Sequence, residues 1–329
     1  MKQYRRKERR CFWEVSEGFM DISFKKIELE DKEIIEHYLK KKKYRGCDMV
    51  FCNNYLWSRF YATQFAIVED TLVFCSTRQD GSISVTFPAG ETEQIKKALE
   101  VLFAYFQEKE RPFHMHLVQE YEFELLEQWY PGRFVIEYDR DAADYVYETE
   151  KLTTLAGKKL HGKRNHINNF IKQNPDWSYE RITEENQEDC FQMALKWRQD
   201  HVCEHTGEEN EEIRDEMCVT MNALRLREEL GLVGGLLRVN GEVIAFTLGE
   251  QLNDDTFVVH IEKAYAEIQG AYPMINQQFV KHEAQNYKYV NREEDTGAEG
   301  LRKAKLSYRP AFLVNKGIVC ERKDKNDKN

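Results

Sequence analysis

The strongest constraint on the fold is a pair of hairpin signals, one in each half of the chain. Asp80-Gly81 separates two β-rich runs in the first half, and Asn240-Gly241 separates two more in the second. Such dipeptides accept the positive φ angles of a two-residue turn, so each predicts two adjacent antiparallel strands. A helical pattern and then a further strand follow each hairpin. The chain therefore predicts the same α/β order of elements twice, although few residues match between the halves.

The spacing of apolar residues places the individual elements. In the first half we expect helices over 31–43, 92–109 and 120–129, and strands over 64–68, 71–75, 82–87, 113–117 and 134–138. In the second half we expect helices over 187–205, 211–230 and 273–286, and strands over 232–239, 242–250, 256–261, 289–291 and 312–320.

An acidic, turn-prone stretch, Asp139–Asp144, marks the expected join between the halves. We expect a first lobe over 1–144, a second lobe over 145–320 and a disordered polar tail over 321–329. Tyr145 and Tyr147 should lie on a short strand that bridges the lobes. The first lobe has no polar cluster comparable to those of the second, so we expect it to act as a scaffold and the second lobe to carry the site.

Composition excludes several classes of protein. The formal net charge is -10, which argues against a globally basic nucleic-acid binder. No run approaches twenty apolar residues, so we expect no transmembrane helix and no secretory signal. The eight cysteines form no CxxC pair and are expected to be reduced thiols of a cytoplasmic protein.

The segment 152–172 contains no acidic residue although the whole chain is acidic. Lys158, Lys159, Lys163, Arg164 and His166 can form a positive strip suited to phosphates, including those of a tRNA. The alternative is a solvated helix face whose charges are balanced by acids from elsewhere in the fold.

Two further segments place polar residues near strand ends. His260 and Glu262 alternate on one predicted strand, where they could act together as acid and base, or Glu262 could bind an amine. The alternative is a structural ion pair of Glu262 with Lys263 or another neighbour. The helix start at 269–273 follows, and backbone N–H groups between 264 and 271 could hold a carbonyl oxygen.

The second of these segments, 291–310, groups acids, glycines and then cations. Glu293, Glu294 and Asp295 could recognise a cationic amino group, while Arg302 and Lys305 could hold a phosphate or the acceptor end of a tRNA. The alternative is a polar turn that leads into an amphipathic helix. A separate motif, His201-Val-Cys-Glu-His205, has residue types that can bind a metal. No third ligand has a fitting spacing, so we expect no metal.

Taken together, these segments resemble an uncharacterised bacterial family related to the C-terminal region of phosphatidylglycerol lysyltransferase. The residues that carry the resemblance are Tyr145-x-Tyr147, Gly157-Lys158-Lys159-Leu160-His161-x-Lys163-Arg164-Asn165-His166, His260-x-Glu262-Lys263-Ala264, Gly270-x-Tyr272-x-x-Ile275-Asn276, Asn291-Arg292-Glu293-Glu294-Asp295 and Leu301-Arg302-x-Ala304-Lys305-x-Ser307-Tyr308-x-Pro310. The resemblance implies two tandem GNAT-like α/β lobes, each a mixed twisted sheet flanked by helices. It also implies transfer of an acyl or aminoacyl group.

We assign roles on that basis. The expected catalytic residues are His260, Glu262, Glu293 and Glu294. The expected substrate-binding residues are Lys263, Tyr272, Asn276, Asp295, Arg302, Lys305 and Tyr308. The expected phosphate- or tRNA-binding residues are Lys158, Lys159, Lys163, Arg164 and His166.

The donor and the acceptor stay open at this stage. Aminoacyl-tRNA and acyl-CoA are both candidate donors to an amine or hydroxyl. GNAT enzymes hold the CoA pyrophosphate in a glycine-rich loop, whereas this chain keeps only Gly270 there and places Glu267 where it would repel an anion. The relatives also use a membrane domain to present their lipid, which this chain lacks. The alternative function is a non-catalytic ligand- or tRNA-binding protein, and the sequence does not define the oligomeric state.

Overall fold

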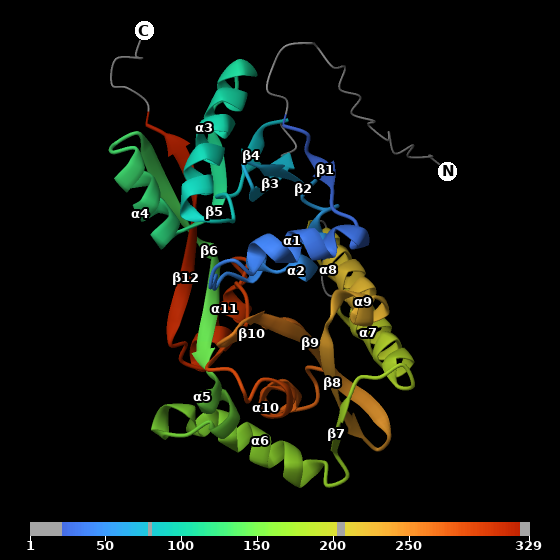
Figure 1. Ribbon diagram of the computed structural model, residues 1–329. Coiled ribbons are helices and arrows are strands. Elements are labelled where there is room, and N and C mark those ends of the chain that lie inside the picture. Colours follow the sequence, from blue (N-terminus) through green and yellow to red (C-terminus); the bar gives the residue numbers. More distant parts are fainter. Residues whose placement is uncertain (1–21, 78–80, 203–207, 323–329) are drawn as a thin grey trace.

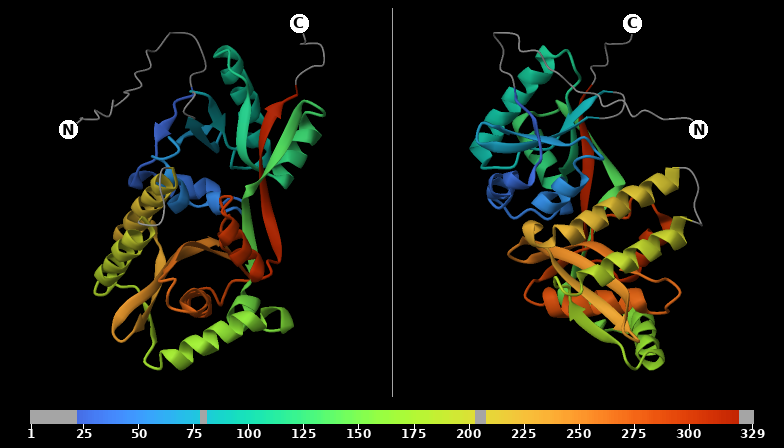
Figure 2. Two further views of the ribbon diagram at one scale, coloured as in Figure 1. Left: turned by 180° about the vertical axis from the view of Figure 1, so that it is seen from behind. Right: turned by 90° about the vertical axis from the view of Figure 1, so that its right-hand side faces the viewer.

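The computed structural model describes residues 22–77, 81–202 and 208–322, and side chains between 200 and 212 are left out of the description. A mixed sheet of twelve strands runs through the whole of this part, in the order β1-β2-β3-β4-β5-β12-β6-β11-β10-β9-β8-β7 (Figure 1). Helices flank the sheet in two lobes, which Figure 2 shows from two further sides. The expected fold class, two α/β lobes with mixed sheets, is confirmed.

The first lobe contains the strands β1 to β5 and the helices α1 to α4. Its strands are β1 (Lys25–Lys26), β2 (Gln64–Val68), β3 (Thr71–Thr77), β4 (Ile83–Val85) and β5 (His114–Gln119). Its helices are η1 (Leu29–Asp31), α1 (Lys32–Leu39), η2 (Cys47–Met49), α2 (Phe51–Trp57), α3 (Thr92–Glu108) and α4 (Glu120–Trp129). The apolar stripe of α3 packs on the sheet through Leu99, Leu102 and Phe106, which are all buried.

The second lobe contains the strands β7 to β11 and the helices α5 to α11. Its strands are β7 (Ser178–Arg181), β8 (Val233–Val239), β9 (Glu242–Asn253), β10 (Thr256–Ala264) and β11 (Tyr289–Asn291). Its helices are α5 (Thr149–Thr154), η3 (Lys158–Leu160), α6 (His161–Gln173), α7 (Gln187–Val202), α8 (Glu208–Arg225), α9 (Arg227–Leu230), α10 (Ala271–Glu283) and α11 (Glu299–Ser307). The expected helices end within a few residues of these bounds, and 203–207 lie outside the described residues.

Two long strands cross from one lobe to the other. β6 (Phe134–Glu148) and β12 (Phe312–Glu321) pair in antiparallel register from Phe134↔Glu321 to Val146↔Phe312. β12 also pairs with β5, so the last strand of the chain completes the sheet of the first lobe. The proposed domain boundary at 144/145 therefore falls inside β6.

The turn expected at Asp139–Asp144 is an irregularity within β6: Asp139 pairs with Lys316 and Asp144 with Val314 of β12, and the four residues between them interrupt the register. The acids that suggested a turn have tertiary partners. Asp144 forms an ion pair with Lys316 of β12 at 2.7 Å, and Asp141 forms one with Arg302 of α11 at 2.5 Å. With their charges balanced, these residues can stay in a strand.

The segment 152–172 is also divided differently from the expected single strip. α5 ends at Thr154, Leu155 adopts a left-handed conformation, and Gly157 has φ +91° before η3 and α6 begin. α1 and α2 join the core of the second lobe, since Ile35, Phe51 and Cys52 belong to the same buried cluster as Phe246 and Phe279. Figure 1 shows both helices between the two lobes.

The structure bears on the expectations for the C-terminal tail and for transmembrane helices. Glu321 closes β12, and the remainder of the expected tail, 323–329, lies outside the described residues. None of the helices in the described ranges combines the length and apolar character needed to cross a bilayer. The His201–His205 motif falls among residues whose side chains are not described.

Candidate functional site

The candidate site lies where two parallel strands separate. β10 and β11 pair only from Thr256↔Tyr289 to Val258↔Asn291, after which β11 ends and β10 continues to Ala264. Beyond this point, side chains bridge the opening instead of backbone hydrogen bonds. Carboxyl ends of strands that separate in this way are a usual place for ligand sites in α/β folds.

Glu262 is the centre of the first bridging cluster, which we call the Glu262 cluster. Its Oε1 accepts a hydrogen bond from Arg292 Nη2 at 2.9 Å, and its Oε2 accepts one from Asn276 Nδ2 of α10 at 3.0 Å. The two ionic side chains are only 13% and 11% exposed. Asn276 Oδ1 is buried and has no hydrogen-bond partner within the described part of the chain. The Asn276 Oδ1 atom can therefore accept a hydrogen bond from a ligand beside the Glu262 carboxylate, which is held by two hydrogen bonds.

Aromatic rings and a lysine complete the Glu262 cluster. The Arg292 guanidinium lies 4.9 Å from the ring centre of Tyr308 and 5.8 Å from that of Tyr147. The ammonium of Lys163, on α6, lies 4.1 Å from the Tyr308 ring. Burial lowers the pKa of Lys163, and the nearby charge of Arg292 lowers it further. Six parts of the chain, β6, α6, β10, α10 and the ends of β11 and α11, therefore contribute to this one group of side chains.

His260 belongs to a different cluster from Glu262. The β9–β10 register shifts between Val259 and Ile261, so His260 is a bulge residue and the expected alternation with Glu262 is interrupted. Its Nδ1 lies 2.7 Å from Glu293 Oε1 and its Nε2 lies 3.0 Å from Glu250 Oε1. His260 and Glu262, which were expected to act as a pair, therefore make hydrogen bonds with different residues.

The surroundings of His260 determine its charge. Burial disfavours the charged imidazole, but the hydrogen bonds to Glu250 and Glu293 outweigh it and raise the pKa of His260 to about 10. At neutral pH the ring is therefore protonated and has no lone pair with which to accept a proton. A base needs a lone pair to accept a proton, so this geometry does not favour the expected role of His260 as a base.

Several other expected site residues bind one another. Asp295 is fully buried, and it accepts hydrogen bonds from Arg302 Nε at 2.9 Å and Nη2 at 2.6 Å. Burial alone would raise the pKa of Asp295, but the bonds from Arg302 and Tyr145 lower it. Lys263 pairs with Glu216 at 2.5 Å. These charges satisfy each other inside the fold, which does not favour direct binding of a substrate.

The loop after β11 is held in a strained conformation by its neighbours. Glu293 has φ +57° and Thr296 has φ +49°, both in the left-handed region that costs a non-glycine residue energy. Lys305 donates hydrogen bonds from Nζ to the carbonyl oxygens of Arg292, at 2.7 Å, and Glu294. The Glu294 carboxylate accepts a hydrogen bond from Cys47 at 3.4 Å, away from Glu262. Lys305 therefore positions the loop, and the loop positions Arg292.

The expected positive strip separates into three parts. Lys158, Lys159 and His166 are exposed, while Lys163 turns inward to the Glu262 cluster. Arg164 Nη1 donates hydrogen bonds to the carbonyl oxygens of Leu155 and Gly157, so it stabilises the connection between α5 and η3.

The expected backbone oxyanion site is wrong for three of its groups. The N–H groups of Tyr265, Ile268 and Ala271 donate to the carbonyl oxygens of Ile244, Tyr265 and Ile268. The start of α10 is covered as well. A Cβ atom on Gly270, which has φ +91°, would lie 2.5 Å from the carbonyl oxygen of His166 on α6. Only glycine allows this contact, which leaves little room for an anion at this helix end.

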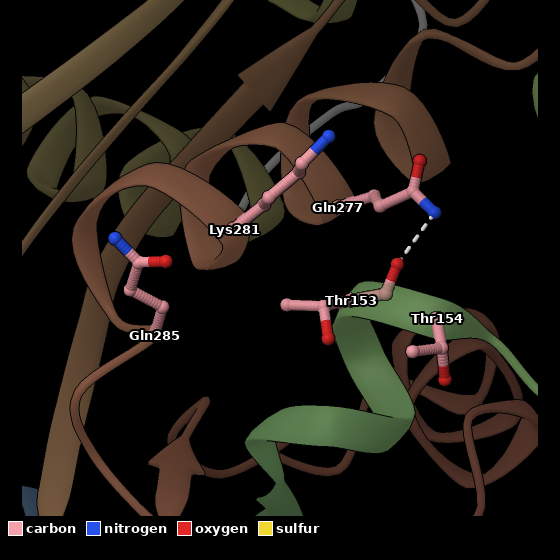
Figure 3. Close-up of a pocket in the computed structure, with 5 residues that line it drawn as sticks. All are labelled: Thr153, Thr154, Gln277, Lys281 and Gln285. Carbon is pink, nitrogen blue, oxygen red and sulfur yellow. Dashed lines mark hydrogen bonds between the residues drawn. The ribbon is translucent and has the colours of Figure 1, made fainter.

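A surface pocket lies beside α5 and α10 and is separate from the Glu262 cluster. Thr153, Thr154, Gln277, Lys281 and Gln285 line it, and Gln277 Nε2 donates to the Thr153 carbonyl oxygen at 2.8 Å (Figure 3). Gln277 follows Asn276 on the same helix, so this pocket borders the site without sharing its charged groups.

The sequence anticipated part of the Glu262 cluster. Glu262, Asn276, Lys163 and Tyr308 were all expected site residues, and the structure brings them together. Tyr272 lies on the neighbouring turn of α10, where burial raises the pKa of its hydroxyl. Arg292 was not among the expected site residues, which at this point of the chain were its acidic neighbours Glu293 and Glu294. The sequence signal for Arg292 is that it is a single cation directly after a buried strand.

The matching family model defines an acyltransferase-like protein, whose fold is two α/β lobes that share one mixed sheet. The chain belongs to the family described as phosphatidylglycerol lysyltransferase, C-terminal, whose model matches residues 40–317.

Similar proteins agree with this assignment. A crystal structure of a conserved protein of unknown function from Bacteroides thetaiotaomicron is 39% identical, covers 92% of this chain and all of its own, and has a TM-score of 0.85. L-PGS from Bacillus licheniformis is 14% identical over 90% of this chain and 93% of its own, with a TM-score of 0.61, which shows a shared fold. An uncharacterised protein of Mycoplasmoides gallisepticum is 27% identical over 58% of this chain, and the match spans 61% of that relative.

Proposed function

We propose that this protein transfers an aminoacyl group from aminoacyl-tRNA to an amine or hydroxyl, with Glu262 as the base. The observation that carries the proposal is the arrangement of acceptor oxygens at the opening between β10 and β11. The Glu262 carboxylate is held on both oxygens, and Asn276 Oδ1 beside it lacks a partner among the described residues. Together they suit a group that has several N–H or O–H bonds to donate, such as an amine.

The proposed reaction assigns one task to each side chain. The acceptor nitrogen or oxygen forms a bond to the carbonyl carbon of the aminoacyl ester, and its proton passes to Glu262. The ester C–O bond then breaks, and the tRNA ribose oxygen leaves with the proton that Glu262 has taken up, which restores the carboxylate. Lys163 stabilises the negative charge that develops on the carbonyl oxygen, which is usually a large contribution in a site with little water. Arg292 holds Glu262 in position through its hydrogen bond to Oε1.

The choice of donor rests on the start of α10. Because the His166 carbonyl lies against Gly270, the place where a GNAT fold would hold the pyrophosphate of CoA is occupied by the chain itself. Lys158 and Lys159 on η3 and His166 on α6 are exposed and available for the phosphates of a tRNA. These features favour aminoacyl-tRNA over acyl-CoA.

A transfer assay with matched variants tests the role of Glu262. Radiolabelled aminoacyl-tRNA, or acetyl-CoA in a parallel reaction, is incubated with a bacterial extract of small amines and lipids, and label in the products is counted. Loss of a positioned base should lower the rate of Glu262→Gln by about 10² or more. The control is Glu283→Gln, which removes another buried carboxylate, paired with the exposed Arg181, at the other end of α10. Wild-type rates in Glu262→Gln would refute the assignment of the base.

The same assay separates the donors and the alternative function. Transfer from acetyl-CoA alone would refute the choice of aminoacyl-tRNA. Filter binding against salt concentration measures the contribution of phosphates, and Lys158→Ala/Lys159→Ala should weaken tRNA binding and reduce its salt dependence. Tight tRNA binding without transfer under any condition would favour the non-catalytic binding protein.

A further inference from the structure

A second group of polar side chains, away from the Glu262 cluster, joins α2 to the sheet of the second lobe. It consists of Cys52 on α2, Glu250 on β9 and His260 on β10, and one ligand atom from each lies within 4.8 Å of the others. Cys52 is fully buried, and its thiol makes no hydrogen bond with any residue that the structure describes. The His260 and Glu250 side chains are only 6% and 11% exposed.

These three side chains match the chemistry of a zinc site. A thiolate, an imidazole nitrogen and a carboxylate oxygen are the three kinds of protein ligand that Zn²⁺ takes, at about 2.3, 2.0 and 2.0 Å. In a tetrahedral site such bonds put ligand atoms roughly 3.3 to 3.6 Å apart. His260 Nε2 and Glu250 Oε1 are already 3.0 Å apart, so only the Cys52 sulfur has to approach.

Glu293 supplies the residue that such a site needs behind its histidine. A metal-bound imidazole donates its other N–H to a carboxylate or carbonyl, which sets its tautomer and orientation. Glu293 Oε1 lies 2.7 Å from His260 Nδ1 and leaves Nε2 facing Glu250. Glu293 has a left-handed backbone conformation, and we infer that this strained conformation is kept because it directs the carboxylate toward His260.

A second cluster in the same fold shows what a filled arrangement of this kind looks like. Cys47, Asp48 and Asp144 also place their ligand atoms within 4.8 Å of one another. There the chain provides its own cation, because Lys316 Nζ lies 2.7 Å from Asp144 and 2.9 Å from Asp48. At Glu250 the cation is the protonated His260 itself, at 3.0 Å, and among the described residues no lysine or arginine forms an ion pair with this carboxylate.

We propose that Cys52, Glu250 and His260 bind one Zn²⁺ ion, with Glu293 orienting the histidine and a water molecule completing the tetrahedron. The ion replaces the Nε2 proton of His260 and the thiol proton of Cys52. It connects α2 to β9 and β10, and so fastens a helix of the first lobe to the sheet that carries the Glu262 cluster. The proposal does not depend on the transfer reaction.

Cobalt substitution tests the ligands directly. Purified metal-free protein is titrated with Co²⁺, whose thiolate complex has a charge-transfer absorption in the near ultraviolet. The wild type should bind one equivalent and show this band, and Zn²⁺ should displace it. Cys52→Ser should lose the band and at least about tenfold in affinity. The matched control is Cys75→Ser, which alters an equally buried thiol on β3 and should behave as wild type.

Thermal unfolding gives an independent measurement. A ligand that binds only the folded state raises the melting temperature with its concentration, so Zn²⁺ should stabilise the wild type and Cys75→Ser but not Cys52→Ser. Glu250→Gln, which keeps the size of the side chain, should lower the affinity while the thiolate band remains. Absence of a bound equivalent in the wild type, or a thiolate band that survives in Cys52→Ser, would overturn the proposal.

Discussion

Lys316 is a buried cation on which three parts of the chain depend. Its side chain is 2% exposed, and its Nζ lies 2.7 Å from Asp144 on β6 and 2.9 Å from Asp48 on η2. Burial disfavours the ammonium, but the two carboxylates outweigh this and raise the pKa of Lys316 well above its ordinary value. The group is therefore charged in the folded protein at neutral pH.

Replacing this lysine by methionine should be among the most damaging single changes in the protein. Lys316→Met leaves Asp144, which has no exposed surface, with three neutral donors: the Cys47 N–H at 2.7 Å, the Cys47 thiol at 3.3 Å and Asn291 Nδ2 at 2.9 Å. Removing one partner of a buried ion pair typically costs about 3–5 kcal/mol. We expect the free energy of unfolding to fall by that amount, since the remaining hydrogen bonds carry no full positive charge.

A double-mutant cycle with Asp144→Asn, measured by urea unfolding and tryptophan fluorescence, isolates the charge interaction. The neutral amide can still accept the Cys47 N–H, so the double variant should be more stable than the sum of the two single losses by at least about 2 kcal/mol. Lys25→Met is the control, because Lys25 pairs with Asp31 but is 61% exposed and should change stability by about 1 kcal/mol or less. Additive losses, or a Lys316→Met variant within about 1 kcal/mol of wild type, would refute the reasoning.

Two further predictions concern a carboxyl group and a glycine. Burial raises the pKa of Glu122 from 4.5 to about 8, so this group contributes stability that is complete below about pH 4.5 and is lost as the pH rises to about 8. Glu122→Gln should therefore gain stability relative to wild type by up to about 1.4 kcal/mol for each pH unit in this window, and parallel urea-unfolding curves against pH would contradict this. Gly270→Ala should cost about 2 kcal/mol or more, because the methyl group would meet the His166 carbonyl at a positive φ. Gly162→Ala, whose Cβ would meet nothing within 4 Å on the helix α6, should instead be neutral or stabilising in the same thermal-unfolding assay.

Local sequence patterns predicted the elements whose causes are local. The helix α4 has the expected bounds and α3 differs by one residue, because an apolar stripe at helical spacing depends only on nearby residues. The hairpin at Asn240-Gly241 depends likewise on the conformations that these two residues accept. Glu262 and Lys163 were expected from two polar segments of the sequence, whereas Asn276 and Tyr308 were expected only from the family resemblance.

The errors have non-local causes. Asp139 and Asp144 lie in β6 because both pair with β12, which begins only at Phe312, and the cation that neutralises Asp144 follows only at Lys316. No window of sequence around the acids contains that information. Asp295 and Arg302 were expected to face a substrate, yet the fold turns them toward each other.

The amino-acid sequence by itself determined the α/β class, the repeated order of elements and the set of polar segments from which a site could be built, since each follows from residues close together in the chain. Only the tertiary structure decided which charges stay available. A bulge at His260 separates that residue from Glu262, and the opening between β10 and β11 brings Arg292 to Glu262. The physical reason is that an ionisable group acquires its role from the partners and the burial that the fold gives it.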